Sequence, residues 1–242
     1  MSCDAISAFP PIVDKSTRKG AFFVFVCYSC NVQRMRYMKK ALLYIHGKGG
    51  SADEAEHYKT IFTDYEVIGF DYHGETPWET KKEFSEAYNR LSWAYERISI
   101  VSNSIGAYFT MNALAEMYIE KAFFISPIVN MEKLISDMLR QSGISERELE
   151  EKKEIKTSFG EVLSWEYLCY VRKNPIVWNV PTDILYGEND ILTSIKTISE
   201  FAERCGATFT VMKNGEHWFH TEEQMKFMDN WLKTCLKKGK IK

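Results

Sequence analysis

The chain has 242 residues, of which 45% are hydrophobic and 26% are charged, and this globular composition excludes an intrinsically disordered chain. Its 31 Lys and Arg residues against 33 Asp and Glu residues leave a formal net charge of −2, so no basic excess supports a dedicated nucleic-acid binder. No apolar run reaches the ~20 residues that span a bilayer, and we therefore expect no membrane span.

Residues 1–37 form an N-terminal extension whose role the sequence leaves open. Its apolar run 21–30 follows a small basic cluster and so mimics a signal peptide, but no small-x-small cleavage site follows the run. The β-branched and aromatic residues of the run favour a strand over residues 22–29. A third possibility is that synthesis starts at Met35 or Met38.

The six cysteines lack the spacing of a disulfide framework or a metal site. Cys27 and Cys30 make a single Cys-x-x-Cys motif, whereas a zinc site needs a second pair of Cys or His residues at a similar spacing. We expect reduced thiols in a cytoplasmic protein, with no bound metal.

From residue 38 onward, short apolar runs alternate with helical segments, and Ser51 with Glu54 forms a capping box at one helix start. The nearly continuous apolar character of the runs is typical of an α/β fold with a mostly parallel central sheet and helices on both faces. We expect a single domain with strands at 40–45, 65–70, 98–102, 122–125, 183–186 and 208–212, and long helices at 79–95, 105–118 and 221–238.

Residues 127–181, called the insertion below, interrupt this alternation. A connection between a strand and a helix usually takes far fewer residues, so we interpret the insertion as an added helical cap. Its charge run 146–156 is typical of a solvated helix face. Its aromatic segment 159–170 either faces a binding pocket or packs the cap against the sheet domain.

The strand at 98–102 leads into Ser102-Asn103-Ser104-Ile105-Gly106, directly before a helix. A serine on a sharp strand-to-helix turn is exposed at the carboxyl edge of the sheet, beside the free N–H groups of the helix start. Ser104 therefore fits an exposed nucleophile, with the N–H of Ile105 as an oxyanion donor. Ser102 is the rival nucleophile, but it still lies within the strand, and we favour Ser104.

The segment His46-Gly47-Lys48-Gly49-Gly50 follows the strand at 40–45. Its glycines permit backbone conformations that turn N–H groups inward, and the N–H of Lys48 fits a second oxyanion donor. A phosphate-binding loop would instead need Gly-x4-Gly-Lys followed by Ser or Thr, which this segment lacks.

Two more polar segments follow predicted strands. Asp190 lies in 186–190 and His217 lies in 215–218, just past the next strand. A lone Asp in a turn is usually a turn former. Ser, Asp and His in this order, each after a strand, indicate a nucleophile, an acid and a base.

These segments resemble those of the α/β-hydrolases. The matching segments are HGKGG (46–50), SNSIG (102–106), YGEND (186–190) and GEHW (215–218), and FDYHG (70–74) resembles the loop after the family's fourth strand. The order nucleophile, acid, histidine is the family's. The resemblance runs from about Lys40 to Leu236 and departs at Ser102, where the commonest elbow has glycine.

The resemblance implies a serine hydrolase that cleaves a small carboxylic ester or thioester through an acyl-enzyme. Ser104 would attack the carbonyl, His217 would take its proton, Asp190 would orient His217, and the N–H groups of Lys48 and Ile105 would form the oxyanion hole. The resemblance also implies a small-molecule acyl substrate as the partner and no need for a metal or an organic cofactor. Two alternatives stay open: an amide, peptide or C–C bond hydrolase on the same triad, and a non-catalytic binding protein on the same scaffold.

The insertion and the segment around His217 supply candidate pocket residues. Lids of this kind cover the nucleophile and shape the substrate pocket. We expect an apolar pocket wall from Phe159, Leu163, Trp165, Tyr167 and Trp218.

Overall fold

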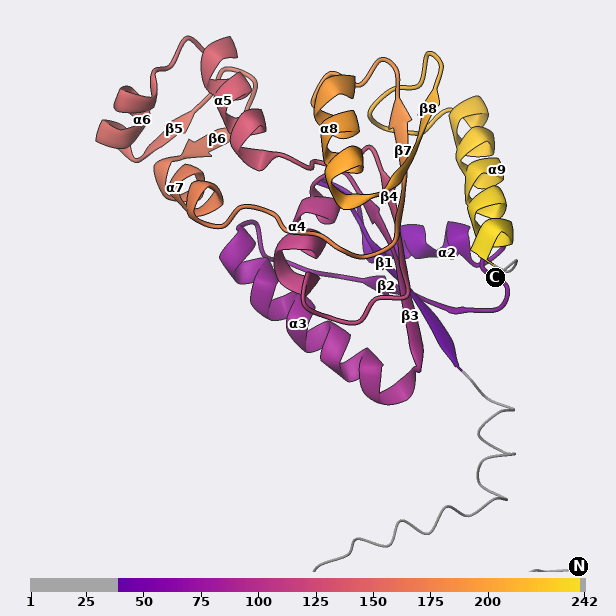
Figure 1. Ribbon diagram of the computed structural model, residues 1–242. Coiled ribbons are helices and arrows are strands. Elements are labelled where there is room, and N and C mark those ends of the chain that lie inside the picture. Colours follow the sequence, from indigo (N-terminus) through magenta and orange to yellow (C-terminus); the bar gives the residue numbers. More distant parts are fainter. Residues whose placement is uncertain (1–38, 240–242) are drawn as a thin grey trace, which may run out of the picture. The chain divides into compact units, whose positions relative to one another are not determined.

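The computed structural model describes residues 39–239 (Figure 1). The expectations for residues 1–37, including the strand at 22–29 and the motif of Cys27 and Cys30, lie outside the described residues. None of the helices in residues 39–239 combines the length and the apolar character that a membrane crossing requires.

Six strands form one fully parallel sheet, in the order β2-β1-β3-β4-β7-β8. Each strand lies within one residue of the expected bounds at either end. The observed bounds are β1 (Lys40–Ile45), β2 (Glu66–Phe70), β3 (Arg97–Asn103), β4 (Lys121–Ile125), β7 (Thr182–Gly187) and β8 (Thr208–Met212). The predicted α/β class with a parallel central sheet is confirmed.

Helices cover both faces of this sheet because its strands are apolar on both sides. Along β1, Ala41, Leu43 and Ile45 pack on one face, while Leu42 and Tyr44 pack on the other. The first face carries α3 (Pro77–Ala94), α4 (Ile105–Leu114) and α8 (Ile195–Cys205), and the second carries η1 (Ala52–Glu54), α2 (Ala55–Tyr58) and α9 (Glu222–Gly239) (Figure 1).

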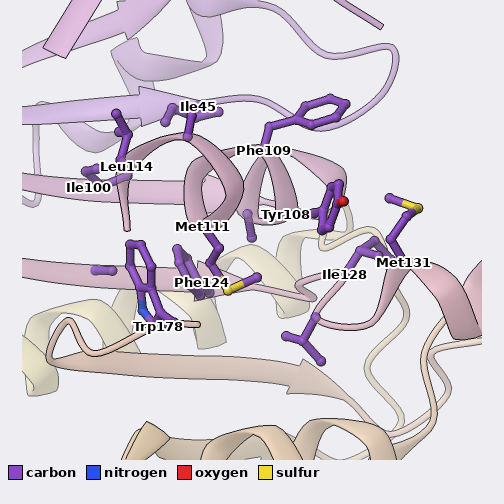
Figure 2. Packing of buried hydrophobic residues seen from close by; sticks show 14 of the residues in the cluster. Ile45, Ile100, Tyr108, Phe109, Met111, Leu114, Phe124, Ile128, Met131 and Trp178 are labelled. Atoms are coloured by element: carbon purple, nitrogen blue, oxygen red, sulfur yellow. The ribbon is translucent and has the colours of Figure 1, made fainter. Parts of the chain in front are cut away.

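The larger apolar core lies on the face of α3, α4 and α8. Ile45 and Ile100 of the sheet meet Phe109 and Leu114 of α4, and Trp178 packs on Phe124 with ring centroids 5.6 Å apart (Figure 2). This packing fixes α4 against the sheet and so fixes the turn that precedes it.

Two helix boundaries differ from the expectation by more than one residue. Helix α3 starts two residues earlier, because Thr76 and Glu79 form a capping box and Pro77 takes the first helical position. Helix α4 ends at Leu114 rather than at residue 118. The N–H of Met117 turns back to the Leu114 carbonyl and the chain then enters β4.

The insertion is only partly helical. It contains α5 (Met131–Gln141), α6 (Glu146–Lys152), an antiparallel hairpin of β5 (Glu154–Lys156) with β6 (Val162–Ser164), and α7 (Trp165–Lys173). The charge run 146–156 is therefore helical only to Lys152, because its last three residues pair with β6.

The insertion packs on the helical face of α3 and α4. Leu163 is almost fully buried in the same apolar core as the sheet. The ring of Tyr170 lies 5.3 Å from that of Trp78 on α3, and its hydroxyl donates to the Asn112 amide oxygen on α4 at 3.2 Å.

Candidate active site

A sharp turn at Ser104 joins β3 to α4. Ser104 has φ 50° and ψ −121°, a strained conformation for a residue with a side chain. Gly106 permits this turn, because a Cβ there would lie 2.3 Å from the His46 carbonyl oxygen. The local geometry is that of a nucleophile elbow, with the serine presented at the carboxyl edge of the sheet.

The neighbouring Ser102 occupies a different environment. It is fully buried, and its hydroxyl lies 2.9 Å from that of Thr110, which donates to the Gly106 carbonyl at 2.7 Å. Ser102 thus contributes to the packing of α4 on β3, and its hydroxyl does not face the site.

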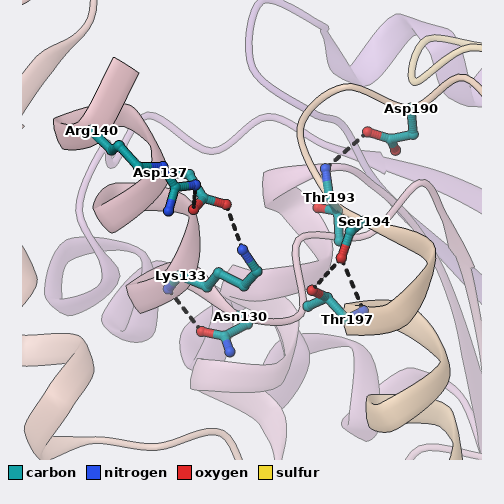
Figure 3. Close-up of polar contacts among 8 residues, drawn as sticks. All are labelled: Asn130, Lys133, Asp137, Arg140, Asp190, Thr193, Ser194 and Thr197. Atoms are coloured by element: carbon teal, nitrogen blue, oxygen red, sulfur yellow. Dashed lines mark hydrogen bonds and ion pairs between the residues drawn. The ribbon is translucent and has the colours of Figure 1, made fainter. Parts of the chain in front are cut away.

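A continuous set of hydrogen bonds links the side chains of Ser104, His217 and Asp190. The Ser104 Oγ lies 2.8 Å from His217 Nε2, and His217 Nδ1 lies 2.7 Å from Asp190 Oδ2. The other carboxylate oxygen of Asp190 accepts the backbone N–H of Leu192 at 2.8 Å. It also accepts the backbone N–H of Thr193 at 3.0 Å (Figure 3). The Asp190 side chain has no solvent exposure, so its carboxylate is held in one orientation.

The loops that carry Asp190 and His217 are joined to each other. The N–H of Asn189 donates to the Gly215 carbonyl at 2.7 Å. Glu188 is the nearest alternative acid in the sequence, but its carboxylate accepts the N–H of Asn214 at 2.9 Å. Asp190, rather than Glu188, therefore faces the histidine.

The glycine loop after β1 lies against the serine. A Cβ on Gly47 would lie 3.1 Å from the Ser104 Cβ, so the loop backbone passes directly beside Ser104. Within residues 39–239, the N–H groups of Lys48 and Ile105 donate to no protein acceptor. The Lys48 ammonium pairs outward with Glu161 of the insertion.

A cavity of about 660 Å³ adjoins Ser104 and His217 on the side of α2 and α9. Its walls combine polar and apolar side chains. The polar ones include Lys48, Glu54, His57, Asn103 and His220, and the apolar or aromatic ones are Tyr44, Tyr58, Ile125, Trp218, Phe219, Met225 and Met228.

The five residues expected in the pocket wall lie in different surroundings. Of the five predicted residues, only Trp218 lines this cavity. Leu163 is buried in the core, Trp165 and Tyr167 pack against that core, and Phe159 is about half exposed. The insertion docks on α3 and α4, whereas residues of α2 and α9 line the cavity, and these four side chains are not among its lining residues.

Sequence reasoning missed the cavity residues on α2 and α9. Met225 and Met228 lie on an apolar helical stripe that predicts simple packing, and Met228 is indeed buried. Tyr58 and His57 lie on a helix of one turn. Only Asn103 could have been expected near the cavity from the sequence, because it directly precedes the predicted nucleophile.

Within the described part of the chain, no three His, Cys, Asp or Glu side chains gather in a way that holds a metal ion. The three cysteines described, Cys169, Cys205 and Cys235, are all free thiols.

No protein-family model and no curated protein sequence matches the chain. Solved structures do. Est1E from Butyrivibrio proteoclasticus is 14% identical and superposes with a TM-score of 0.65, covering 85% of this chain and 90% of its own. Alpha/beta hydrolase domain-containing protein 10 from mouse is 16% identical, with a TM-score of 0.64 over 82% of this chain and 90% of its own.

A thermophilic esterase from Thermogutta terrifontis is 14% identical, with a TM-score of 0.55 over 83% of this chain and 90% of its own. These likenesses extend over most of each chain. The chain therefore has the α/β-hydrolase fold.

Proposed function

We propose that the chain is a serine hydrolase that cleaves a small carboxylic ester or thioester through an acyl-enzyme. The observation that carries this proposal is the set of hydrogen bonds from Asp190 through His217 to Ser104, with contacts of 2.7 and 2.8 Å. The fold supports it, because solved structures with this fold include esterases.

In the first step, Ser104 Oγ attacks the substrate carbonyl carbon while its proton passes to His217 Nε2. The carbonyl electron pair moves to the oxygen, which the N–H groups of Lys48 and Ile105 stabilise by ~3 kcal/mol per donor. The intermediate collapses, the ester or thioester bond breaks, and the leaving group takes the proton from His217. Asp190 stabilises the charged form of His217 throughout.

In the second step, water attacks the acyl-enzyme. His217 takes a proton from the water and returns it to Ser104 Oγ as the acid leaves. Each proton that His217 accepts is thus given back within the same step.

The cavity on the side of α2 and α9 is where we place the apolar portion of the substrate. Its lining of Tyr58, Phe219, Met225 and Met228 excludes water from that portion, and methionines adapt to varied shapes. We propose that the insertion acts as a cap on the other side of the nucleophile, where Glu161 contacts Lys48 of the glycine loop.

The test is hydrolysis of p-nitrophenyl acetate, butyrate and octanoate by the wild type and by Ser104→Ala. Ser92→Ala, an exposed serine on α3, is the matched control. We expect turnover by the wild type and the control and only buffer-level hydrolysis by Ser104→Ala at an unchanged melting temperature. Binding of the esters without turnover by the wild type would contradict the proposal and favour a binding protein.

A further inference from the structure

A hydrogen-bonded chain connects the nucleophile turn to the glycine loop through β1. The Asn103 amide donates to the Tyr44 hydroxyl at 2.9 Å, and that hydroxyl donates to a carboxylate oxygen of Glu54. The other carboxylate oxygen accepts the Ser51 N–H at 3.3 Å. Asn103 directly precedes Ser104, and Ser51 directly follows the glycine loop, so the chain spans the two halves of the proposed oxyanion hole.

Tyr44 is the central residue of this hydrogen-bonded chain, and its position is fixed on both sides. Tyr44 is fully buried in β1, and its hydroxyl has one donor and one acceptor as partners. Burial raises the pKa of the Tyr44 phenol, and neighbouring Tyr58 and Glu54 raise it further, so the hydroxyl keeps the proton that it donates. Each hydrogen bond therefore has a fixed donor and acceptor, from Asn103 to Tyr44 and from Tyr44 to Glu54.

The glycine loop has few other constraints. Gly50 closes a turn by donating to the Gly47 carbonyl at 3.1 Å, and Gly49 has φ 75° with open space around it. The Glu54 carboxylate packs on Gly50, where a Cβ would lie 2.8 Å from its oxygen. The outward ion pair of Lys48 is a weak restraint, because the Lys48 side chain is 69% exposed and exposed pairs contribute ~0–1 kcal/mol.

We propose that Glu54, held in place by Tyr44, is a positioning residue that holds the Lys48 N–H at the oxyanion. This inference rests on the proposed function. A residue with this role stabilises the transition state without touching the substrate carbonyl in the ground state.

A purely structural role for Glu54 as a helix cap makes a different prediction. Loss of a cap lowers the free energy of unfolding by ~1 kcal/mol and leaves kcat of the folded enzyme unchanged. Loss of a positioning residue lowers kcat and leaves KM nearly constant, because only transition-state binding is affected. The two roles therefore separate in the kinetics.

The experiment compares Glu54→Ala, Glu54→Gln and Tyr44→Phe with Glu56→Ala, an exposed control on the same helical segment. Each variant is measured for kcat and KM with p-nitrophenyl butyrate, for inhibition by a trifluoromethyl ketone that forms an oxyanion on the serine, and for melting temperature. Removal of an oxyanion donor costs about 100- to 1000-fold, so we expect a displaced donor to cost about 10- to 100-fold in kcat.

We expect Glu54→Ala to lose kcat and ketone affinity by the same factor, with KM within about twofold of the wild type. Glu54→Gln keeps an acceptor for Tyr44 and should recover most of the loss. The double variant of Glu54→Ala with Tyr44→Phe should have a kcat no lower than that of the slower single variant, since both substitutions interrupt the same hydrogen-bonded chain. Glu56→Ala should match the wild type.

An active wild type with unchanged kcat in Glu54→Ala overturns this inference alone. Additive losses in the double variant overturn it as well, because they place Glu54 and Tyr44 in separate roles. A wild type that fails to hydrolyse any ester contradicts the proposed function and removes the basis of the inference with it.

Discussion

Gly106→Ala tests how closely α4 must approach β1 for the site to form. The added Cβ would lie 2.3 Å from the His46 carbonyl oxygen, against about 3.4 Å for an ordinary contact, so backbone must move by roughly 1.1 Å. Neither atom belongs to a flexible side chain, and the shift therefore falls on the turn that carries Ser104 or on the glycine loop. A misplacement of about 1 Å costs about 100-fold in rate.

Overpacking of this kind also costs about 1–3 kcal/mol of unfolding free energy. Gly143→Ala is the control, because it adds a methyl group in open space at φ 65°, far along the chain in the insertion. It should lose about 1–2 kcal/mol of stability from the backbone conformation alone and keep its kcat. We would measure urea unfolding and ester kcat for both variants. An unchanged kcat in folded Gly106→Ala would refute the argument that this close approach sets the nucleophile.

Three further predictions follow from single contacts. Asp190→Asn should lower kcat by up to ~10⁴ without unfolding the protein, and a loss below about tenfold in ester kinetics would point to another acid. Met228→Trp should lower kcat/KM for the octanoate ester relative to the acetate ester by at least about tenfold, since each methylene contact is worth ~1–3 kcal/mol. An unchanged ratio would mean that the acyl chain of the substrate binds outside this cavity. Burial raises the pKa of Asp183, but hydrogen bonds from Lys121 and Thr208 outweigh it and hold that pKa below its usual range. The stabilisation by ionised Asp183 is thus fully present above the pKa of an aspartate in the unfolded chain. It is lost as the pH falls through the pKa of Asp183 in the folded protein. Lys121→Met should therefore lower the free energy of unfolding in urea by about 3–5 kcal/mol at neutral pH and by less in acid. An equal loss at both pH values would contradict this pH dependence.

The sheet was predictable because each strand is marked within its own residues. The run 40–45 is apolar on both faces and ends at His46, and the structure has β1 over the same residues. The positions of Ser104, Asp190 and His217 follow from the same property. Parallel strands bring their carboxyl ends to one edge, so residues just past three strands meet whatever the connections between them.

The cavity wall and the hairpin were not predictable, because both depend on contacts between distant segments. Strands β5 and β6 have three residues each, and their pairing exists only because the turn between them closes. Tyr58 and Met228 meet across 170 positions of sequence. Their own neighbours indicate only burial, and nothing local shows that the space between them stays open. The aromatic residues of the insertion are conspicuous in the sequence, and two of them, Tyr167 and Tyr170, contact Trp78 of α3.

Covalent labelling with a fluorophosphonate tests the central claim, that Ser104 is the nucleophile. The measurement is the intact mass of the labelled protein, followed by peptide mapping, for the wild type, Ser104→Ala and Ser102→Ala. We predict one adduct per chain on the peptide that contains residue 104, no adduct on Ser104→Ala, and labelling of folded Ser102→Ala, because the buried Ser102 hydroxyl faces Thr110. An adduct on Ser104→Ala, or an adduct on the wild type at any other residue, would contradict the account.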